Sequence, residues 1–537
     1  MRRRGRNNLL GFHVEIHSLA LTILGRLPQA AVCLIIVSAG LIAIIKPKVS
    51  ISAKTAARWA IGITATMTGL SLLMWGTYLA FPSYLDHICA TVTMTTIQLR
   101  DGGPLYTAIN SGQRYSLLYG PSTYLINLAG VLLFSDPIFG SKFLGVACAF
   151  LSLVGMGLLV YRLWKFPRVI FIFLYFLLTT SFFGQAFFLN RADSVMMLGC
   201  IGVAIGVLLI RQGLLSSLLI AVSAAFVCNG KIHGALYLLP MLPLAWSHKN
   251  RGWLSGTIFL TILFTVGPFF LHGISSSEYV LWLKMASRHP LSLSLFVQNI
   301  AVALAILLPI GIAMTPRHNL TNIDKQFITL LLFAITSVAI IAAKLGAGYS
   351  HFLLFCPALT IALALALEKG EQPINMAASA TIAVWVMIMW TAVSIDIFHI
   401  IFICDRNYSR KVELRKELLV FKQDYAGQTI IMGYSDGDYE STFLRPLLDR
   451  PPNTPNLWDA PAMMDMGLSG LSLPESVYSE LESYRGVIIT PIGRPFELNS
   501  WYPPGQPLFG KRFIKTFNAR FRQDKIGRYY CTWVPRD

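Results

Sequence analysis

Acidic residues are scarce in this chain of 537 residues, which has 26 Asp and Glu against 44 Lys and Arg. Charged residues of both signs make up only 13% of the sequence, whereas 55% is hydrophobic. Long apolar runs recur from end to end, and a water-soluble core cannot hold that many apolar side chains. The scarcity of charge therefore excludes a soluble enzyme and a disordered chain, and it indicates a polytopic helical membrane protein.

Cysteine is also scarce, with eight residues in the whole chain. Most of them lie inside apolar runs, namely Cys33, Cys148, Cys200, Cys228 and Cys356. Their spacing matches neither a zinc motif nor a disulfide framework. We interpret most of them as small buried hydrophobic residues.

The few charges are unevenly distributed along the chain. Residues 1–403 hold 26 Lys and Arg but only 10 Asp and Glu, whereas residues 404–537 hold 18 and 16. The positive excess sits in short loops between apolar runs, which is typical of cytoplasmic loops and argues against a nucleic-acid partner. We therefore divide the chain into a basic and hydrophobic N-terminal segment (1–57), a transmembrane domain (58–403) and a polar C-terminal domain (404–537).

The apolar runs predict about 11–13 transmembrane helices. They cover roughly residues 28–46, 58–81, 142–161, 168–185, 195–210, 214–228, 234–247, 252–271, 295–314, 326–343, 351–367 and 376–403. The stretch 119–134 opens with Gly-Pro and is too short to span, so we expect a juxtamembrane or re-entrant helix. In the C-terminal domain, β-like runs at 428–435 and 485–493 alternate with amphipathic helical runs, which predicts a small α/β domain.

Loop charge predicts which ends of these helices face the cytoplasm. Five loops remain for the opposite side once the basic loops are placed inside, and these are 82–141, 184–194, 228–234, 272–292 and 346–351. The C-terminal domain falls on the same side. We expect a multi-pass protein of the plasma (inner) membrane with an extracytoplasmic C-terminal domain; the topology of residues 1–57 stays open.

Two acidic residues of the transmembrane domain are distinguished by their position. Asp86 in YLDHICAT and Asp193 in NRADSVMM lie at the outer ends of predicted membrane helices and face the same compartment. Ionisable residues at such positions are costly unless they are paired or line a wet cavity. We therefore interpret both carboxylates as functional.

The long outer loop carries a recognisable order of features. Asp86 ends a membrane helix, a predicted surface helix follows, GGPLY occupies 102–106, and YGP at 119–121 opens the juxtamembrane helix. This order resembles the catalytic loop of the GT-C glycosyltransferases, polytopic enzymes that use sugars linked to polyprenyl phosphate. Asp193 is similar to the second acidic position of that superfamily.

The resemblance covers about residues 58–403 and is greatest to the ArnT-like and protein-mannosyltransferase-like members. Two features depart from the usual pattern. The paired acids of the superfamily are replaced by Asp86-His87, and its Pro-Pro is replaced by Gly120-Pro121. The exact subfamily therefore stays open.

The resemblance implies transfer of a sugar from a polyprenyl-phosphate donor to an envelope glycan, lipid or protein acceptor among the membrane lipids. Such a transfer needs a base for the incoming proton and positive charge for the departing phosphate. Asp86 is our candidate base for an inverting displacement, and Asp193 our candidate for orienting acceptor or sugar. The further candidates for substrate binding are His87, Tyr106, Arg114, Tyr119, Lys231, Tyr349 and His351.

Two alternatives accompany this hypothesis. His87 beside Asp86 could serve a divalent cation, although a lone histidine more often forms local hydrogen bonds, so we predict no metal site and no certain cofactor. A transporter or flippase for a lipid-linked or anionic substrate would also carry acids in membrane helices. Transporters usually show internal repeats and acids near the midplane, whereas here no repeat is evident and the acids cluster on one side.

The topology can be tested with reporter fusions. A reporter placed after Cys404 or within 272–292 should report the extracytoplasmic side, and one within 248–251 should report the cytoplasm. A cytoplasmic reading for the C-terminal domain would contradict the assignment of every loop.

Overall fold

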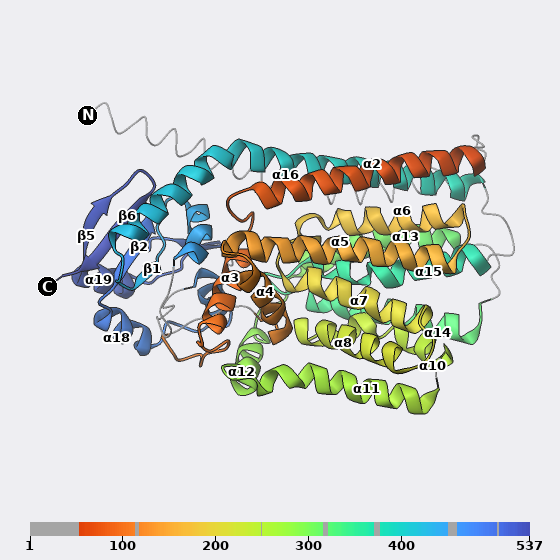
Figure 1. Ribbon diagram of the computed structural model, residues 1–537, viewed down its shortest axis with the longest axis horizontal. Coiled ribbons are helices and arrows are strands. Elements are labelled where there is room, and N and C mark those ends of the chain that lie inside the picture. Colours follow the sequence, from red (N-terminus) through yellow and green to blue (C-terminus); the bar gives the residue numbers. More distant parts are fainter. Residues whose placement is uncertain are drawn as a thin grey trace.

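The fold is given by a computed structural model that describes residues 53–112, 118–248, 250–314, 320–369, 376–448, 459–501 and 504–536. The predicted segment 28–46 and almost all of the N-terminal segment lie outside the described residues. Helices run side by side along the long axis of the molecule, and a small α/β domain sits at one end of them (Figure 1). The predicted fold class, a helical membrane protein with a small C-terminal α/β domain, is confirmed.

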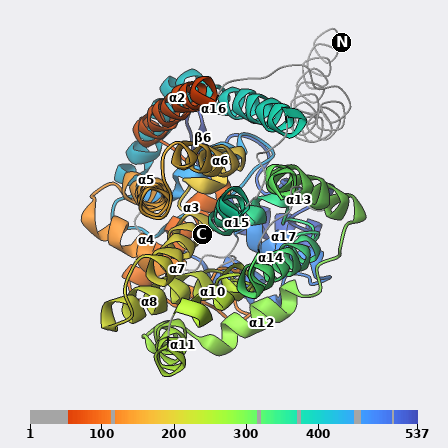
Figure 2. The same cartoon turned by 90° about the vertical axis from the view of Figure 1, so that its right-hand side faces the viewer.

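Seven helical segments within the described residues are long and apolar enough to cross a membrane. They are α2 (Ala53–Ala80), α5 (Pro137–Leu163), α11 (Arg251–Val266) with η2 (Gly267–Phe270), α13 (Leu293–Ala313), α14 (Asn322–Ile341), η3 (Tyr349–Phe355) with α15 (Cys356–Lys369), and α16 (Met376–Asp424). The shorter apolar helices are α4 (Pro121–Leu133), α6 (Arg168–Phe182), α7 (Ala192–Leu208) and α8 (Leu214–Gly230). Seen end-on, these helices form a bundle in which α15 is surrounded by others (Figure 2).

Two predicted helical segments differ in detail from the structure. The run 234–247 is divided into α9 (Ala235–Leu238) and α10 (Met241–His248), because Pro240 lacks the N–H that a continuous helix needs. The predicted domain boundary at Cys404 lies inside α16, a single helix of 49 residues that ends at Asp424. Its second half is amphipathic and buries Leu414, Leu418 and Phe421, so the helix extends from the bundle into the C-terminal domain.

Small residues let the helices near the site approach closely. A Cβ added to Gly199 of α7 would lie 2.7 Å from the Ser223 carbonyl oxygen of α8, so only glycine allows this contact. Gly120 is packed in the same way against the carbonyl of Asn229, and its N–H donates to the Gly230 carbonyl at 3.0 Å. The juxtamembrane helix α4 is thereby fixed against the end of α8.

The C-terminal domain is built on a four-stranded sheet with the order β1-β2-β6-β5. Its strands are β1 (Ile430–Met432), β2 (Val487–Pro491), β5 (Phe521–Ile526) and β6 (Tyr530–Pro535). The strands β1 and β2 are fully buried, as the runs 428–435 and 485–493 predicted, and the structure pairs them in parallel. The remaining elements are η4 (Tyr439–Leu447), α17 (Ala460–Leu468), α18 (Glu475–Ser483), the hairpin of β3 (Asn499–Trp501) and β4 (Pro504–Pro507), and α19 (Lys511–Arg520).

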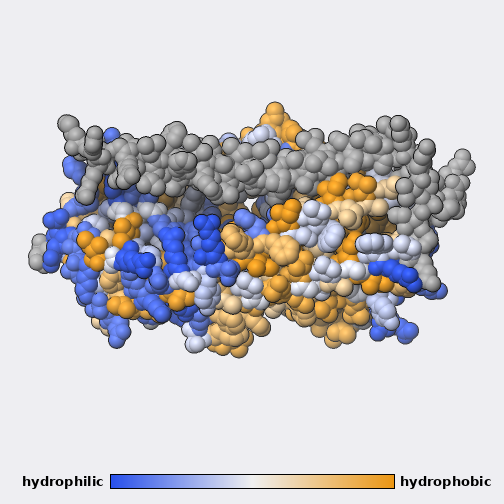
Figure 3. Space-filling view, turned by 90° about the horizontal axis from the view of Figure 1, so that it is seen from above, coloured by the Kyte–Doolittle hydropathy of each residue, from blue (hydrophilic) through white to orange (hydrophobic). Residues whose placement is uncertain are grey.

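The C-terminal domain lies at the bundle end that carries α3 (His87–Arg100), α4 and α12 (Ser276–Ala286) (Figure 1). The hydropathy of the surface changes along the same axis, with an apolar middle and hydrophilic surface at both ends (Figure 3). The five loops predicted to share one side also meet here, for example where Leu105 donates to the Gly273 carbonyl at 2.7 Å. Which side of the membrane this end faces stays a prediction.

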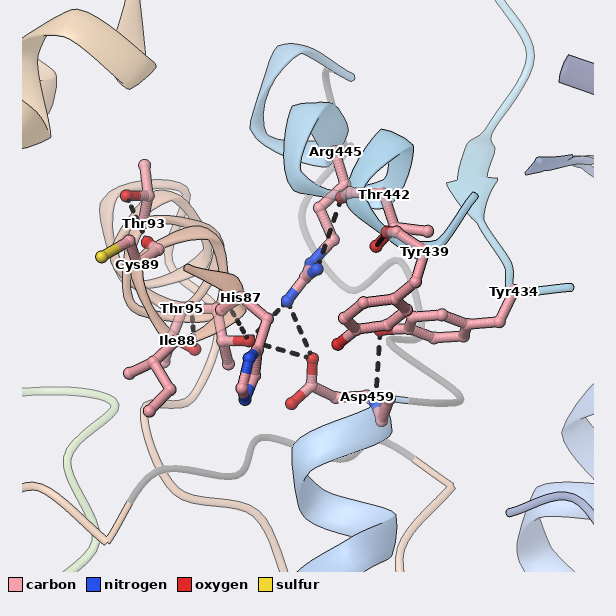
Figure 4. A network of polar contacts seen from close by, with 12 residues as sticks. His87, Ile88, Cys89, Thr93, Thr95, Tyr434, Tyr439, Thr442, Arg445 and Asp459 are labelled. Atoms are coloured by element: carbon pink, nitrogen blue, oxygen red, sulfur yellow. Dashed lines mark hydrogen bonds and ion pairs between the residues drawn. The ribbon is translucent and has the colours of Figure 1, made fainter. Parts of the chain in front are cut away.

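A buried ion pair within the C-terminal domain contacts α3. Both members of the pair are drawn in Figure 4. The Arg445 guanidinium lies 3.2 Å from the Asp459 carboxylate and also donates to the Thr91 hydroxyl of α3. Their side chains are only 4% and 2% exposed. Opposite charges at such depth are tolerated because each offsets the other. The Thr91 hydroxyl contacts both members of the pair, which docks the domain on α3.

Removing one member of this pair should be costly. Arg445→Met leaves the Asp459 carboxylate buried without its cation and should destabilise the protein by about 3–5 kcal/mol. The double variant Arg445→Met/Asp459→Leu should regain most of that loss because no charge is left unpaired. Thermal unfolding in detergent measures both, and an unchanged melting temperature of the single variant would contradict the docking.

Candidate functional site

Asp86 lies in the short connection between α2 and α3 and caps the N-terminus of α3. One carboxylate oxygen accepts the Ile88 N–H at 2.6 Å, which satisfies a helical donor that would otherwise lack a partner. The other oxygen pairs with the Arg191 guanidinium. The side chain is 20% exposed, so the carboxylate remains accessible at the end of the bundle.

Sequence reasoning missed Arg191, which precedes α7 in the NRADS motif. Its guanidinium crosses to Asp86, 105 positions earlier in the chain. The Nε–H of Arg191 is buried and has no hydrogen-bond partner within the described residues. The available signal was a cation two positions before Asp193, but only the fold shows that it reaches the other acid.

Asp193 and Lys231 form a second ion pair beside the first. The Lys231 ammonium donates to the Asp193 carboxylate at 2.6 Å, and the two side chains are 9% and 4% exposed. The same ammonium lies 5.7 Å from the centre of the Tyr119 ring. Three of the predicted residues are thereby brought together at the junction of α4, α7 and α8.

The two ion pairs share one electrostatic environment. Burial raises the pKa of Tyr119, the carboxylates of Asp193 and Asp86 raise it further, and Arg191 opposes them. Both carboxylates thus act on Tyr119, whose ring faces the Lys231 ammonium. We call Asp86, Arg191, Asp193 and Lys231 the paired-charge site.

The ionisation of Asp86 is set by its partners. Burial alone would raise the pKa of Asp86, but Arg191, His87 and the Ile88 N–H outweigh burial and hold that pKa below the usual value of a carboxyl group. Burial lowers the pKa of His87 to about 4, against the opposing effect of Asp86. At neutral pH the site therefore holds a carboxylate beside a neutral imidazole.

The C-terminal domain covers the side of the site at His87. The His87 ring stacks on the Trp501 ring of β3 with centroids 5.1 Å apart, and Trp501 in turn meets Tyr439 at 4.5 Å. Neither Trp501 nor Tyr439 was predicted as a site residue. They lie more than 300 positions from His87, and nothing in their local sequence indicates that neighbour.

The remaining predicted residues lie around this centre. The Tyr106 hydroxyl donates to the Tyr119 carbonyl at 2.8 Å and so supports the backbone beside Lys231. His351 meets His233 with ring nitrogens 3.1 Å apart, while the Tyr349 ring packs near Phe182 and Phe183. Arg114 lies outside the described residues, and its role stays a prediction.

Possible metal ligands can be compared within the part of the chain that the structure describes, and metal use stays a prediction. No group of three or more His, Cys, Asp or Glu side chains is placed to hold an ion there. Asp86 and His87 have Oδ1 and Nδ1 3.7 Å apart and lack a third ligand of that kind. The geometry offers instead one accessible carboxylate, two cations and a neutral aromatic wall.

Comparison with known proteins identifies the fold. No family model matches the chain, and no curated protein matches it in sequence. Among solved structures, ArnT from Cupriavidus metallidurans bound to undecaprenyl phosphate aligns with a TM-score of 0.52 at 10% identity, covering 88% of this chain and 98% of that one. The apo state of the same protein aligns with a TM-score of 0.54 at 11% identity over the same shares. The chain therefore has the ArnT-like GT-C fold that its sequence predicted.

Proposed function

We propose that this protein is an integral membrane glycosyltransferase that moves a sugar from a polyprenyl-phosphate donor to an acceptor outside the cytoplasm. The observation that carries the proposal is the paired-charge site, which places an accessible carboxylate and two cations where the helical bundle ends. The fold supports it, because a solved structure with that fold is described as bound to undecaprenyl phosphate. The identities of sugar and acceptor are left open.

The reaction is a single displacement at the anomeric carbon. The acceptor oxygen or nitrogen forms a bond to that carbon while the bond from carbon to phosphate oxygen breaks. The bonding electron pair leaves with the polyprenyl phosphate, and the acceptor proton passes to Asp86. One carboxylate is enough for this inverting course, since the leaving group departs from the opposite face.

The cations of the site would stabilise the departing phosphate. Arg191 has a buried Nε–H without a partner among the described residues, and a phosphate oxygen is a suitable acceptor for it. Lys231 supplies a second positive charge and is held in place by Asp193. Because both cations are paired with carboxylates, an incoming phosphate has to compete with those carboxylates for them.

The low pKa of Asp86 shapes its role as a base. In the resting protein its carboxylate stays charged well below neutral pH. A strongly paired carboxylate is a weak base in the resting protein. If a phosphate draws Arg191 away, burial becomes the dominant influence and the pKa of Asp86 rises toward a useful range.

The position of Asp86 suits a donor that is anchored in the membrane. A polyprenyl chain stays in the bilayer while its sugar phosphate reaches the polar boundary, and Asp86 lies just beyond the last residue of α2. A transporter would need acidic groups along a path through the bundle. The paired acids lie together at one end, which favours the transferase over the transporter or flippase.

Replacing the base gives the first test of the mechanism. Asp86→Asn keeps the size of the side chain and remains a good N-cap for α3, but it cannot take a proton at neutral pH. Turnover should fall about 10²–10⁴-fold while undecaprenyl phosphate still binds. Sugar transfer by purified protein and binding of undecaprenyl phosphate are measured separately.

The chain offers a matched control. Asp136 caps α5 in the same way, with its carboxylate accepting the Ile138 N–H at 2.9 Å and pairing with Arg415 at 2.9 Å. Asp136→Asn should leave turnover close to that of the wild type. If Asp86→Asn also keeps its turnover, the residue is only a helix cap and the proposed mechanism is wrong.

Whether Lys231 binds the donor phosphate can be tested by comparing the affinities of two variants for undecaprenyl phosphate. Asp193→Asn removes the carboxylate that occupies Lys231, so undecaprenyl phosphate should bind more tightly than to the wild type. Asp193→Asn/Lys231→Met should bind it more weakly than Asp193→Asn does, by about 1.5–3 kcal/mol, because a charge-assisted contact is lost. Equal affinities in the two variants would assign Lys231 a structural role.

A further inference from the structure

The side chain of Tyr439 carries a buried hydroxyl without a partner. Its Oη makes no hydrogen bond within the described residues, although the surrounding ring contacts hold the side chain firmly. The ring stacks on Tyr434 with centroids 5.8 Å apart and meets the edges of Trp501 at 4.5 Å and Phe443 at 5.5 Å. A phenylalanine would keep all of these contacts and avoid the cost of the unsatisfied group.

The hydroxyl faces the catalytic end of the protein. Figure 4 shows the Tyr439 ring directed from η4 toward His87, above the Asp459 carboxylate. Burial raises the pKa of Tyr439, and the charges of Arg445, Asp459 and Asp86 all act on that hydroxyl. Tyr439 therefore lies in the same environment as the proposed base, on the side that the C-terminal domain covers.

We propose that Tyr439, Trp501 and His87 form a binding wall for a sugar ring of the acceptor, which makes the acceptor a glycan or glycolipid. This proposal rests on the proposed function, because it assigns the acceptor to the same site. The Tyr439 hydroxyl supplies a hydrogen bond to a sugar hydroxyl. Trp501 and His87 are stacked on each other and only partly buried. The ring surface that their stack leaves exposed supplies the apolar contact for a sugar ring.

The charge of the wall favours this class of ligand. The cations that act on His87, Arg191 and Arg445, are paired with Asp86 and Asp459, and His87 itself is neutral at pH 7. A phosphate or carboxylate would find no free positive charge there among the described residues. A neutral hydroxylated ring needs what the wall offers, namely an aromatic surface and a hydroxyl.

The wall is also held at a fixed distance from the base. Arg445, in the same short helix as Tyr439, contacts Thr91 in the first turns of α3, and that helix begins directly after Asp86. A sugar ring bound against the wall would therefore be held beside the carboxylate. Such fixed placement of two reactants lowers the barrier to their reaction.

Binding of methyl glycosides to the purified full-length protein tests the proposal. Saturation-transfer NMR with methyl glycosides of common hexoses, in the presence of undecaprenyl phosphate, should detect binding to the wild type. Tyr439→Phe should weaken that binding about 5–10-fold and leave the melting temperature equal or higher, since an unsatisfied hydroxyl is removed. Trp501→Ala should weaken it further.

A neighbouring tyrosine provides the control. The Tyr434 hydroxyl accepts the Ala460 N–H at 3.2 Å, so Tyr434→Phe removes a hydroxyl with a structural partner. That variant should lower the melting temperature and keep the affinity for methyl glycosides. If the role of Tyr439 is only structural, Tyr439→Phe should likewise lower the melting temperature and keep the affinity for methyl glycosides.

The remaining outcomes are distinguishable. No binding of any methyl glycoside to the wild type, or equal binding to Tyr439→Phe, would overturn the proposal. Binding of a short Ser- and Thr-containing peptide that is lost in Tyr439→Phe would assign the wall to a polypeptide and overturn it as well. Failure of the wild type to bind undecaprenyl phosphate would instead count against the proposed function, and it is measured on the same samples.

Discussion

The ion pair between Asp86 and Arg191 is the interaction on which the arrangement of the site depends. A carboxylate at the boundary of an apolar bundle is stable only with a partner, and here the partner comes from the start of a different helix. The same rule applies to Asp193 with Lys231 and to Asp459 with Arg445. The first two pairs join segments 105 and 38 positions apart, and so fix the start of α3 against α7 and α7 against α8. The third pair lies within the C-terminal domain and reaches α3 through the Thr91 hydroxyl.

Backbone packing makes these pairs possible. The Asn229 side chain accepts the Ser122 N–H at 2.7 Å and donates to the Thr265 carbonyl, so the end of α8 is tied to α4 and α11 two positions before Lys231. Gly120 and Gly199 remove the side chains that would separate these helices. The charged side chains can therefore meet because Gly120, Gly199 and Asn229 hold the backbones of these helices close together.

Much of this was predictable from sequence, and the reason is physical. The length of an apolar run predicts a membrane helix. A charged residue at the end of such a run is costly and so indicates a functional position, which is why Asp86, Asp193 and Lys231 could be selected. Contacts between residues that are far apart in the sequence were not predicted. The partner of Asp86 is Arg191, and the wall around His87 comes from Trp501 and Tyr439; no local pattern encodes those contacts. The continuity of α16 past Cys404 was missed because its amphipathic half reads as the start of a separate domain.

The departure from paired acids at Asp86-His87 has a consequence for charge. The paired-charge site contains two carboxylates and two cations and is therefore neutral, and the neighbouring His87 adds no charge at pH 7. A second acid at position 87 would leave one negative charge without a cation, beside Trp501 and close to the buried Asp459. A neutral imidazole avoids that charge and adds a ring that stacks on Trp501. The substitution therefore fits a site in which the C-terminal domain packs directly against the start of α3.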